Sequence, residues 1–155
     1  MLNLDINNPD NLAHPPQQQL VGWANHALQA LKIDTAIISI QIVNDIDMQH
    51  YNHSYRGKNN ATNILSFPFE RPPGLPEDAD LDHFLGDIII CPTVLTKEAR
   101  EQHKLLEHHW CHILIHGILH LVGYDHINET DAAAMESLEI SLLAELGIDN
   151  PYLEK

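Results

Sequence analysis

Residues 116–126 read HGILHLVGYDH and place three histidines in the frame H-x-x-x-H-x-x-x-x-x-H. His116 and His120 are four residues apart, so on a helix they project from one face, about 40° and roughly 6 Å apart. At this spacing a helix can offer two imidazoles to one metal ion. Gly123 can end the helix and reverse the chain, which would bring His126 back towards the same ion. The sequence therefore predicts a metal site made of His116, His120 and His126.

The same frame indicates which chemistry the site can support. With its glycine three residues after the second histidine, it matches the ligand spacing of the metzincin proteases. Three neutral imidazoles leave one coordination position open for water, which is typical of catalytic sites. Metalloproteases carry a general-base Glu directly after the first histidine, but here that residue is Gly117. We therefore expect a metal-dependent hydrolase without protease chemistry. One divalent ion is expected and zinc fits best, although nickel, cobalt and copper also bind such sites.

Two further histidines leave an alternative ligand pair open. On a continuous helix His109 and His112 also fall within about 40° of the His116 direction. Helical geometry alone therefore allows His112 with His116 as the pair. The turn at Gly123 favours His116 with His120, which leaves His109 and His112 to pack in the core or to support the ligands.

Three other residues near the frame have less specific roles. Asp125 either orients an imidazole or stabilises the turn in which it lies. Cys111 is five residues before His116, which rotates it about 140° away from the ligand face, so a thiol ligand is not expected. Cys91 and Cys111 each lie in an apolar stretch and are interpreted as small buried thiols of a reducing compartment.

Hydrophobic periodicity around the histidines predicts an α+β fold, a small mixed sheet with helices packed on it. Glycines are expected to end the helices at Gly57, Gly123 and Gly147, Pro92 to begin one, and Thr130 to cap the last. Residues 71–82, RPPGLPEDADLD, form an acidic, proline-rich loop whose tip is the best candidate for disorder. The expected helices are 16–31, 47–55, 93–122 with a candidate break near 102–104, and 130–146. The expected strands are 35–43, 62–67, 85–91 in a central position, and an N-terminal edge strand, LNLDIN.

The composition limits the partners that the chain can bind. Its 155 residues are the size of one domain, so residues 1–155 are expected to form a single hydrolase domain. The net charge of −14 argues against the large basic surface that binds duplex DNA. No apolar run is long enough to span a bilayer, and residues 1–12 lack the features of a secretory signal. We therefore expect a cytoplasmic protein that binds neither membrane nor DNA.

The few basic residues are clustered rather than evenly spread. Arg56 and Lys58 lie together, and Lys97, Arg100 and Lys104 follow the i, i+3, i+7 spacing of one helical stripe. Most such stripes are solvated surface. A small positive patch nevertheless allows a local, oriented contact with a polyanion.

Three sequence blocks resemble the YbeY family, bacterial single-strand-specific endoribonucleases of ribosomal RNA maturation and ribosome quality control. HGILHLVGYDH resembles the family signature H-G-x-L-H-L-x-G-Y-D-H. Residues 55–70, YRGKNNATNILSFPFE, resemble a second block, in which an Arg precedes an often-seen T-D-V-L-S-F-P. Residues 85–91, LGDIIIC, resemble a third, L-G-D-I-x-I. The blocks follow the family's order from about residue 51 to 147, and the histidine block is the most specific of them.

The resemblance implies roles for individual residues. His116, His120 and His126 match the family's metal ligands, and Arg56 matches an arginine regarded as essential for RNA cleavage. Asn63 stands where many members have Asp, so no catalytic role is assigned to it. The implied fold is a mostly parallel sheet with the ligand helix packed across it. The implied substrate is single-stranded ribosomal RNA, including the 3′ end of 16S rRNA. The implied partners are a small-subunit ribosomal protein and an assembly GTPase.

Chemistry supports these roles but leaves alternatives. A metal ion and one fixed guanidinium can hold the charge of a phosphodiester transition state without a protein carboxylate. Without the resemblance, Arg56 would be interpreted as a surface cation near a helix end. The acidic charge predicts weak non-specific RNA affinity, so recruitment by proteins is expected. Two other functions remain: a non-catalytic ribosome-assembly factor with a fold-stabilising metal, and a hydrolase of another substrate, for which Gly117 argues against peptides.

Overall fold

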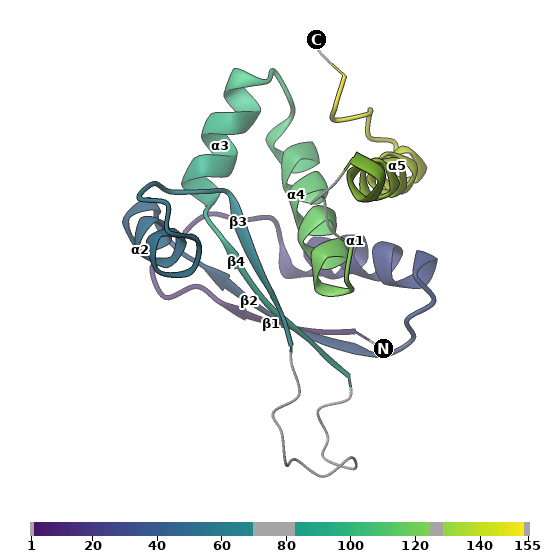
Figure 1. Cartoon of the computed structure of the whole chain (residues 1–155), viewed down its shortest axis with the longest axis horizontal. Coiled ribbons are helices and arrows are strands. Elements are labelled where there is room, and N and C mark those ends of the chain that lie inside the picture. Colours follow the sequence, from purple (N-terminus) through teal and green to yellow (C-terminus); the bar gives the residue numbers. More distant parts are fainter. Residues whose placement is uncertain (1, 70–82, 125–128, 154–155) are drawn as a thin grey trace.

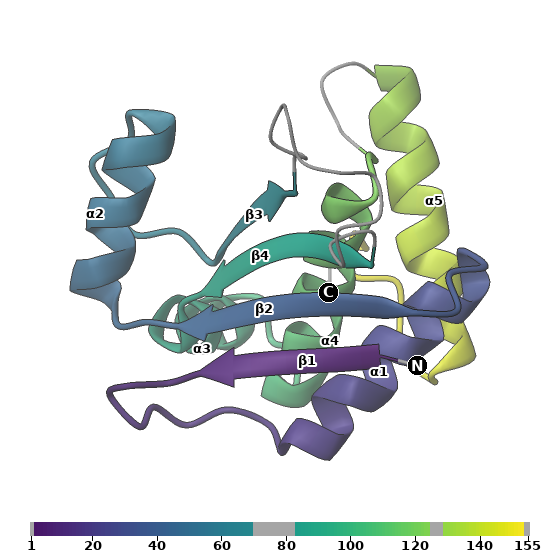
Figure 2. The same cartoon turned by 90° about the horizontal axis from the view of Figure 1, so that it is seen from below.

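The computed structural model describes residues 2–69, 83–124 and 129–153, and these residues form a four-stranded sheet with five helices. The strand order is β1-β2-β4-β3 (Figure 2). Strands β1 (Leu2–Asn7), β2 (Ala36–Ile42) and β4 (Phe84–Ile90) are parallel, whereas β3 (Ile64–Pro68) runs antiparallel to β4 at the sheet edge. The expected mixed, mostly parallel sheet is confirmed, with its N-terminal strand at one edge. The acidic loop expected at 71–82 lies outside the described residues.

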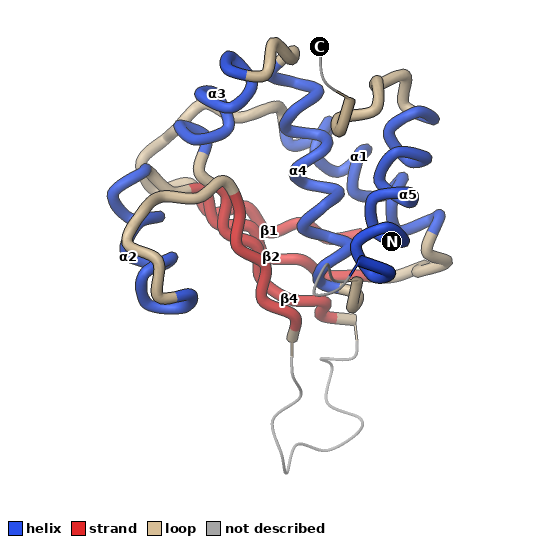
Figure 3. Tube along the Cα trace, turned by 45° about the horizontal axis from the view of Figure 1, so that its top comes forward, coloured by secondary structure: helices blue, strands red, loops and turns tan. Residues whose placement is uncertain are grey.

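The helices cover the sheet unequally. Figures 1 and 3 show α1, α4 and α5 on the same face of the sheet, with α2 well apart from them. None of the helices in the described ranges combines the length and apolarity needed to cross a membrane. Their bounds are α1 Gln17–Ala30, α2 Asp45–Arg56, α3 Pro92–Glu101, α4 Leu106–Leu121 and α5 Glu129–Glu145.

Side-chain alternation along the strands builds a core on each face. Ile88 and Ile90 of β4 join the larger core under α1, α4 and α5, whereas Ile89 joins a smaller one. The smaller core also contains Leu65 of β3 and Met48 of α2, which shows that α2 packs on the opposite face. Because β4 is covered on both sides, its sequence is almost continuously apolar.

Helix α4 lies at the centre of the helical layer. It contacts α1, α3, α5, β3 and β4, and most of its side chains are buried. At Gly117 it approaches β3 so closely that a Cβ atom would lie 2.5 Å from Ile64 Cδ1 and 3.1 Å from Ser66 Oγ. Ser66 Oγ also donates a hydrogen bond to the Gly117 carbonyl, over 3.2 Å. A side chain at the position that holds a general-base Glu in proteases would therefore require the Ile64 side chain to move.

Element boundaries agree with the sequence predictions to within two residues, with two corrections. The helical pattern over 93–122 is broken, as the candidate break suggested: α3 ends at Glu101 and α4 begins at Leu106. His103 in the connection has a φ of +55°, which no helix accommodates. Lys104 therefore does not continue the helical stripe of Lys97 and Arg100, and that part of the prediction is wrong. The cap expected at Thr130 is also wrong, because α5 already begins one residue earlier.

Candidate metal centre and cleft

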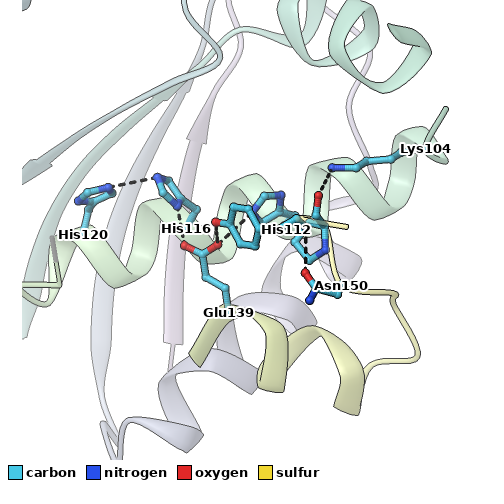
Figure 4. A network of polar contacts seen from close by, with 8 residues as sticks. Lys104, His112, His116, His120, Glu139 and Asn150 are labelled. Atoms are coloured by element: carbon cyan, nitrogen blue, oxygen red, sulfur yellow. Dashed lines mark hydrogen bonds and ion pairs between the residues drawn. The ribbon is translucent and has the colours of Figure 1, made fainter. Parts of the chain in front are cut away.

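His116 and His120 meet on one face of α4 near its C-terminal end. Their Nε2 atoms are 3.2 Å apart (Figure 4). Two imidazole nitrogens bound to one ion at about 2.05 Å with tetrahedral geometry would be about 3.3 Å apart. The separation and the chemistry of this donor pair therefore fit a shared divalent ion. The third residue predicted from the sequence, His126, lies outside the described residues, as does Asp125.

A buried glutamate supports His116 from the opposite side of its ring. Glu139 on α5 is fully buried. Its Oε1 lies 2.6 Å from His116 Nδ1, and its Oε2 lies 3.0 Å from His112 Nε2. The Tyr152 hydroxyl also donates a hydrogen bond to Oε2. Figure 4 shows the Glu139 carboxylate between the imidazoles of His112 and His116, which both project from α4.

This network determines which nitrogen of His116 carries the hydrogen. Burial alone would raise the pKa of Glu139, but hydrogen bonds from His112 and His116 lower it to about 2. The carboxylate is therefore ionised at neutral pH and only accepts hydrogen bonds. His116 must donate from Nδ1, so a neutral His116 has its lone pair on Nε2, the atom that faces His120. This is the carboxylate–histidine arrangement that commonly supports a metal ligand.

Within the described residues, His112, His116 and Glu139 form a second candidate group, because their ligand atoms lie within 4.8 Å of one another. Two observations favour a supporting role for this group. Its nitrogen–oxygen separations of 2.6 and 3.0 Å are hydrogen-bond lengths, and each bond uses a ring hydrogen that metal ligation would remove. Burial also lowers the pKa of His112, which favours the neutral imidazole that donates to Glu139.

Arg56 lies on the same cleft as the two histidines. It is the last residue of α2, which ends at Gly57 in the left-handed conformation with a φ of +73°. A cleft of about 480 Å³ separates this helix end from α4. The structure thus brings a guanidinium from one sequence block to the histidines of another. The residues that line the cleft are Tyr55, Arg56, Thr62, Asn63, Ile64, Leu65, Ser66, Phe67, His116 and His120.

Asn63, at the edge of this cleft, takes part in a structural link. Its Nδ2 donates to Glu98 of α3, over 3.2 and 3.4 Å to the two carboxylate oxygens. The Nε2 of His109 lies 2.9 Å from the same carboxylate. Burial would raise the pKa of Glu98, but the hydrogen bonds from His109 and Asn63 hold it below its ordinary value. The link ties α3 and α4 to the segment that enters β3.

Both cysteines lie in the core as free thiols. Cys91 and Cys111 are fully buried, as the sequence predicts. Burial raises the pKa of the Cys111 thiol to about 12, which disfavours the thiolate that a metal ligand requires. The candidate group of His112, His116 and Glu139 contains no cysteine.

Sequence reasoning missed Glu139 and Tyr152. Glu139 lies on the inward stripe of α5, between the buried Met135 and Leu142. A charged residue at an inward position is rare unless it is paired, so this interruption of the apolar stripe was an available signal. Tyr152 offered none, because it follows the last helix by seven residues and reaches Glu139 only through the fold.

Known proteins resemble this chain over nearly its whole length. The family model described as Endoribonuclease YbeY matches residues 5–147. A protein named Endoribonuclease YbeY from Francisella philomiragia subsp. philomiragia is 52% identical over 157 residues, covering 99% of this chain and 97% of that protein. A protein of the same name from Francisella tularensis subsp. novicida is 47% identical over 154 residues, covering 99% and 94%. The solution structure of TM1509 from Thermotoga maritima matches with a TM-score of 0.55 at 22% identity, covering 95% of this chain and 92% of that one, and supports the fold alone.

Proposed function

The chain belongs to the YbeY family of endoribonucleases, and we propose that it hydrolyses single-stranded RNA in the cleft that Arg56 shares with His116 and His120. One observation carries this proposal: an arginine, a metal-competent histidine pair and a cleft of about 480 Å³ coincide. The cleft is within the size range of small-molecule sites, so it can hold part of a nucleotide chain.

We propose His116, His120 and His126 as the ligands of one divalent ion, with zinc as the first candidate. The 3.2 Å separation of the two described Nε2 atoms supports the pair. A divalent ion bound there would supply a Lewis acid and lower the pKa of a coordinated water. Glu139 would hold the His116 ring in position through its Nδ1 hydrogen, with His112 and Tyr152 completing the hydrogen bonds of the carboxylate.

Arg56 is proposed to hold the scissile phosphate. A guanidinium presents several N–H donors in a rigid plane and can bond two non-bridging oxygens at once. As negative charge builds on those oxygens in the transition state, these hydrogen bonds strengthen. Arg56 is exposed at a helix end on the cleft, which leaves its guanidinium accessible to RNA. Gly117 supplies no general base, so the proton relay of metalloproteases is absent from this position.

The physiological substrate is proposed to be ribosomal RNA, with the 3′ end of 16S rRNA as the target during maturation and quality control. This finer proposal rests on the family resemblance. The net charge of −14 predicts weak general RNA affinity, which supports recruitment by a small-subunit ribosomal protein and an assembly GTPase. A ribosomal substrate also implies action in the cytoplasm.

The test compares metal-free protein with protein reconstituted with zinc, under single-turnover conditions. We expect cleavage of a single-stranded RNA only with metal, and little cleavage of a duplex of the same sequence. The acidic charge favours a second candidate, a ribosome-assembly factor that does not turn over. RNA or ribosome binding without cleavage, with each of zinc, nickel, cobalt and copper, would favour that factor and contradict the proposed hydrolysis.

A further inference from the structure

Tyr55 is an exposed aromatic residue at the cleft. Its side chain is 62% exposed, and it lines the cleft directly beside Arg56 in the sequence. Among the large hydrophobic side chains of the described residues that are exposed, Tyr55 and Tyr152 are the aromatic ones. Tyr152 is bonded to Glu139, which accounts for its position. For Tyr55, the described part of the chain shows no comparable hydrogen bond to a buried group that would explain its position at the cleft.

The Tyr55 ring is held by two neighbours. Tyr51, one turn earlier on α2, lies nearly parallel to it, with ring centroids 6.4 Å apart and an interplanar angle of 12°. Phe67 of β3 contacts it edge to face, with centroids 4.9 Å apart. A ring fixed in this way loses little side-chain entropy when another flat group packs on it. The three rings form an aromatic cluster with one well-exposed member.

Charge alone offers little RNA affinity at this cleft. Arg56 is the only Lys or Arg among the described residues that line it, and Lys58 lies two residues further along the chain. With about two phosphate contacts, the logarithm of the affinity for single-stranded RNA should fall with the logarithm of salt with a slope of only about −1.4. Proteins that bind single strands obtain much of their remaining affinity by stacking bases on aromatic rings.

From these observations we propose that Tyr55 is a stacking platform for one unpaired base of the RNA, next to the phosphate that Arg56 holds. The inference rests on the proposed function and adds a basis for its substrate class. In a duplex both faces of a base are covered by its neighbours, so a duplex cannot offer a base to the ring. Every base has a π-face, so the contact selects single strands without selecting a sequence.

Single-turnover cleavage measured over a range of enzyme concentrations tests the proposal on the intact, zinc-loaded protein. Stacking binds the ground state and the transition state alike, so its loss should weaken binding without slowing the bound complex. For Tyr55→Ala we expect the half-saturating concentration to rise roughly tenfold or more, with the maximal rate within about twofold of wild type. Tyr55→Phe should stay close to wild type. Ile46→Ala, which alters a 65% exposed side chain at the other end of α2, is the matched control and should change neither value.

A substrate change locates the stacked base. A series of RNAs is prepared, each with a single abasic nucleotide at a different position. At one position the missing base should weaken binding to wild type but should not further weaken binding to Tyr55→Ala. This non-additivity is the signature of a direct contact. If every abasic RNA and Tyr55→Ala combined additively, or if Tyr55→Ala lowered the maximal rate and left half-saturation unchanged, the stacking proposal would be wrong. The second result would make Tyr55 a support for Arg56.

A fluorescence measurement separates failure of this inference from failure of the proposed function. Trp23 and Trp110 are buried, so Tyr55→Trp adds an exposed indole that a stacked base should quench. Quenching by single-stranded but not duplex RNA supports stacking even if wild type cleaves no RNA. Cleavage by wild type without quenching, together with unchanged half-saturation in Tyr55→Ala, supports the enzyme and overturns the stacking platform.

Discussion

The Nδ1 atom of His116 lies 2.6 Å from Oε1 of Glu139, so the ring of a proposed metal ligand is fixed by a residue 23 positions later in the chain. The carboxylate is buried and receives two further hydrogen bonds, from His112 and Tyr152. α5 therefore contributes to the proposed metal centre as well as to the core. A carboxylate in this position fixes the tautomer of the ligand and increases its basicity.

Replacing Glu139 with Gln should weaken metal binding. The introduced amide could accept from His116 only through its oxygen, and the negative charge that favours the Nε2 lone pair would be lost. We expect metal affinity to fall by roughly 10- to 100-fold, as for other supporting hydrogen bonds, with helical content retained. Competition with a chromophoric chelator measures this change. Glu136→Gln, on the exposed side of the same helix, is the control, and equal affinities in the two variants would contradict the role of Glu139.

Single substitutions of the histidines distinguish the two candidate metal groups. His116→Ala, His120→Ala and His126→Ala should each remove most of the bound metal. His112→Ala should keep most of it, because Glu139 would still bond His116 and Tyr152. Elemental analysis of each purified variant gives the metal content per chain. Loss of metal in His112→Ala together with retention in His120→Ala would instead assign the ion to His112, His116 and Glu139.

Acid should weaken the link between α3 and α4 through Glu98. The folded pKa of Glu98 is below the ordinary 4.5, so its stabilising contribution is complete above pH 4.5 and is lost as the pH falls through the folded pKa. Glu98→Gln should therefore lose less unfolding free energy than wild type between pH 5 and the acid limit of folding. Urea denaturation at several pH values measures this difference. Glu101→Gln, exposed on the same helix, should behave as wild type; an unchanged pH profile in Glu98→Gln would contradict the prediction.

Gly86 should be essential to the sheet beside the cleft. Its φ is +146°, and a Cβ atom there would lie 2.2 Å from the Phe67 backbone oxygen and 2.9 Å from Leu121 Cδ2. Gly86→Ala should destabilise the protein by about 3 kcal/mol or more, because backbone cannot move aside as a side chain can. Gly22→Ala is the control: its Cβ meets no atom within 4 Å, and a helical Ala should stabilise by about 0.5–1 kcal/mol. Similar melting temperatures for Gly86→Ala and Gly22→Ala would contradict the predicted structural role of Gly86.

The parts of the site that sequence could predict depend on local spacing. His116 and His120 share a face because they are four residues apart on one helix, and Gly57 and Pro92 mark helix ends by their own backbone preferences. The connection at His103 was harder to place, since its positive φ is adopted without the glycine that usually signals such a conformation. The hydrophobic periodicity before and after this connection is almost that of one continuous helix. Lys104 was therefore wrongly predicted to lie on the same helical stripe as Lys97 and Arg100.

The remaining features depend on packing between distant segments. Arg56 and His116 line one cleft because α2 and α4 pack on β3 from opposite faces, and nothing in either sequence block encodes that arrangement locally. Tyr152 reaches Glu139 because the segment after α5 returns to the connection between α3 and α4, where Lys104 Nζ donates to the Pro151 carbonyl over 2.9 Å. Such contacts depend on the whole fold. The family resemblance could therefore indicate a role for Arg56, whereas no local pattern of residues could.

Arg56 tests whether the cleft catalyses or only binds. If its guanidinium bonds charge that develops in the transition state, Arg56→Ala should lower the maximal single-turnover rate roughly a hundredfold or more while weakening RNA binding far less. Arg56→Lys should recover little, because a point charge cannot replace two parallel N–H donors. Lys97→Ala alters an exposed position of α3. It should at most weaken RNA binding and should not change the rate at which bound RNA is cleaved. Rates and affinities must be compared at the same salt concentration, since phosphate contacts depend on it. Equal losses of rate and affinity in Arg56→Ala would make Arg56 a binding residue, and an unchanged rate would make it a surface cation with no part in the reaction.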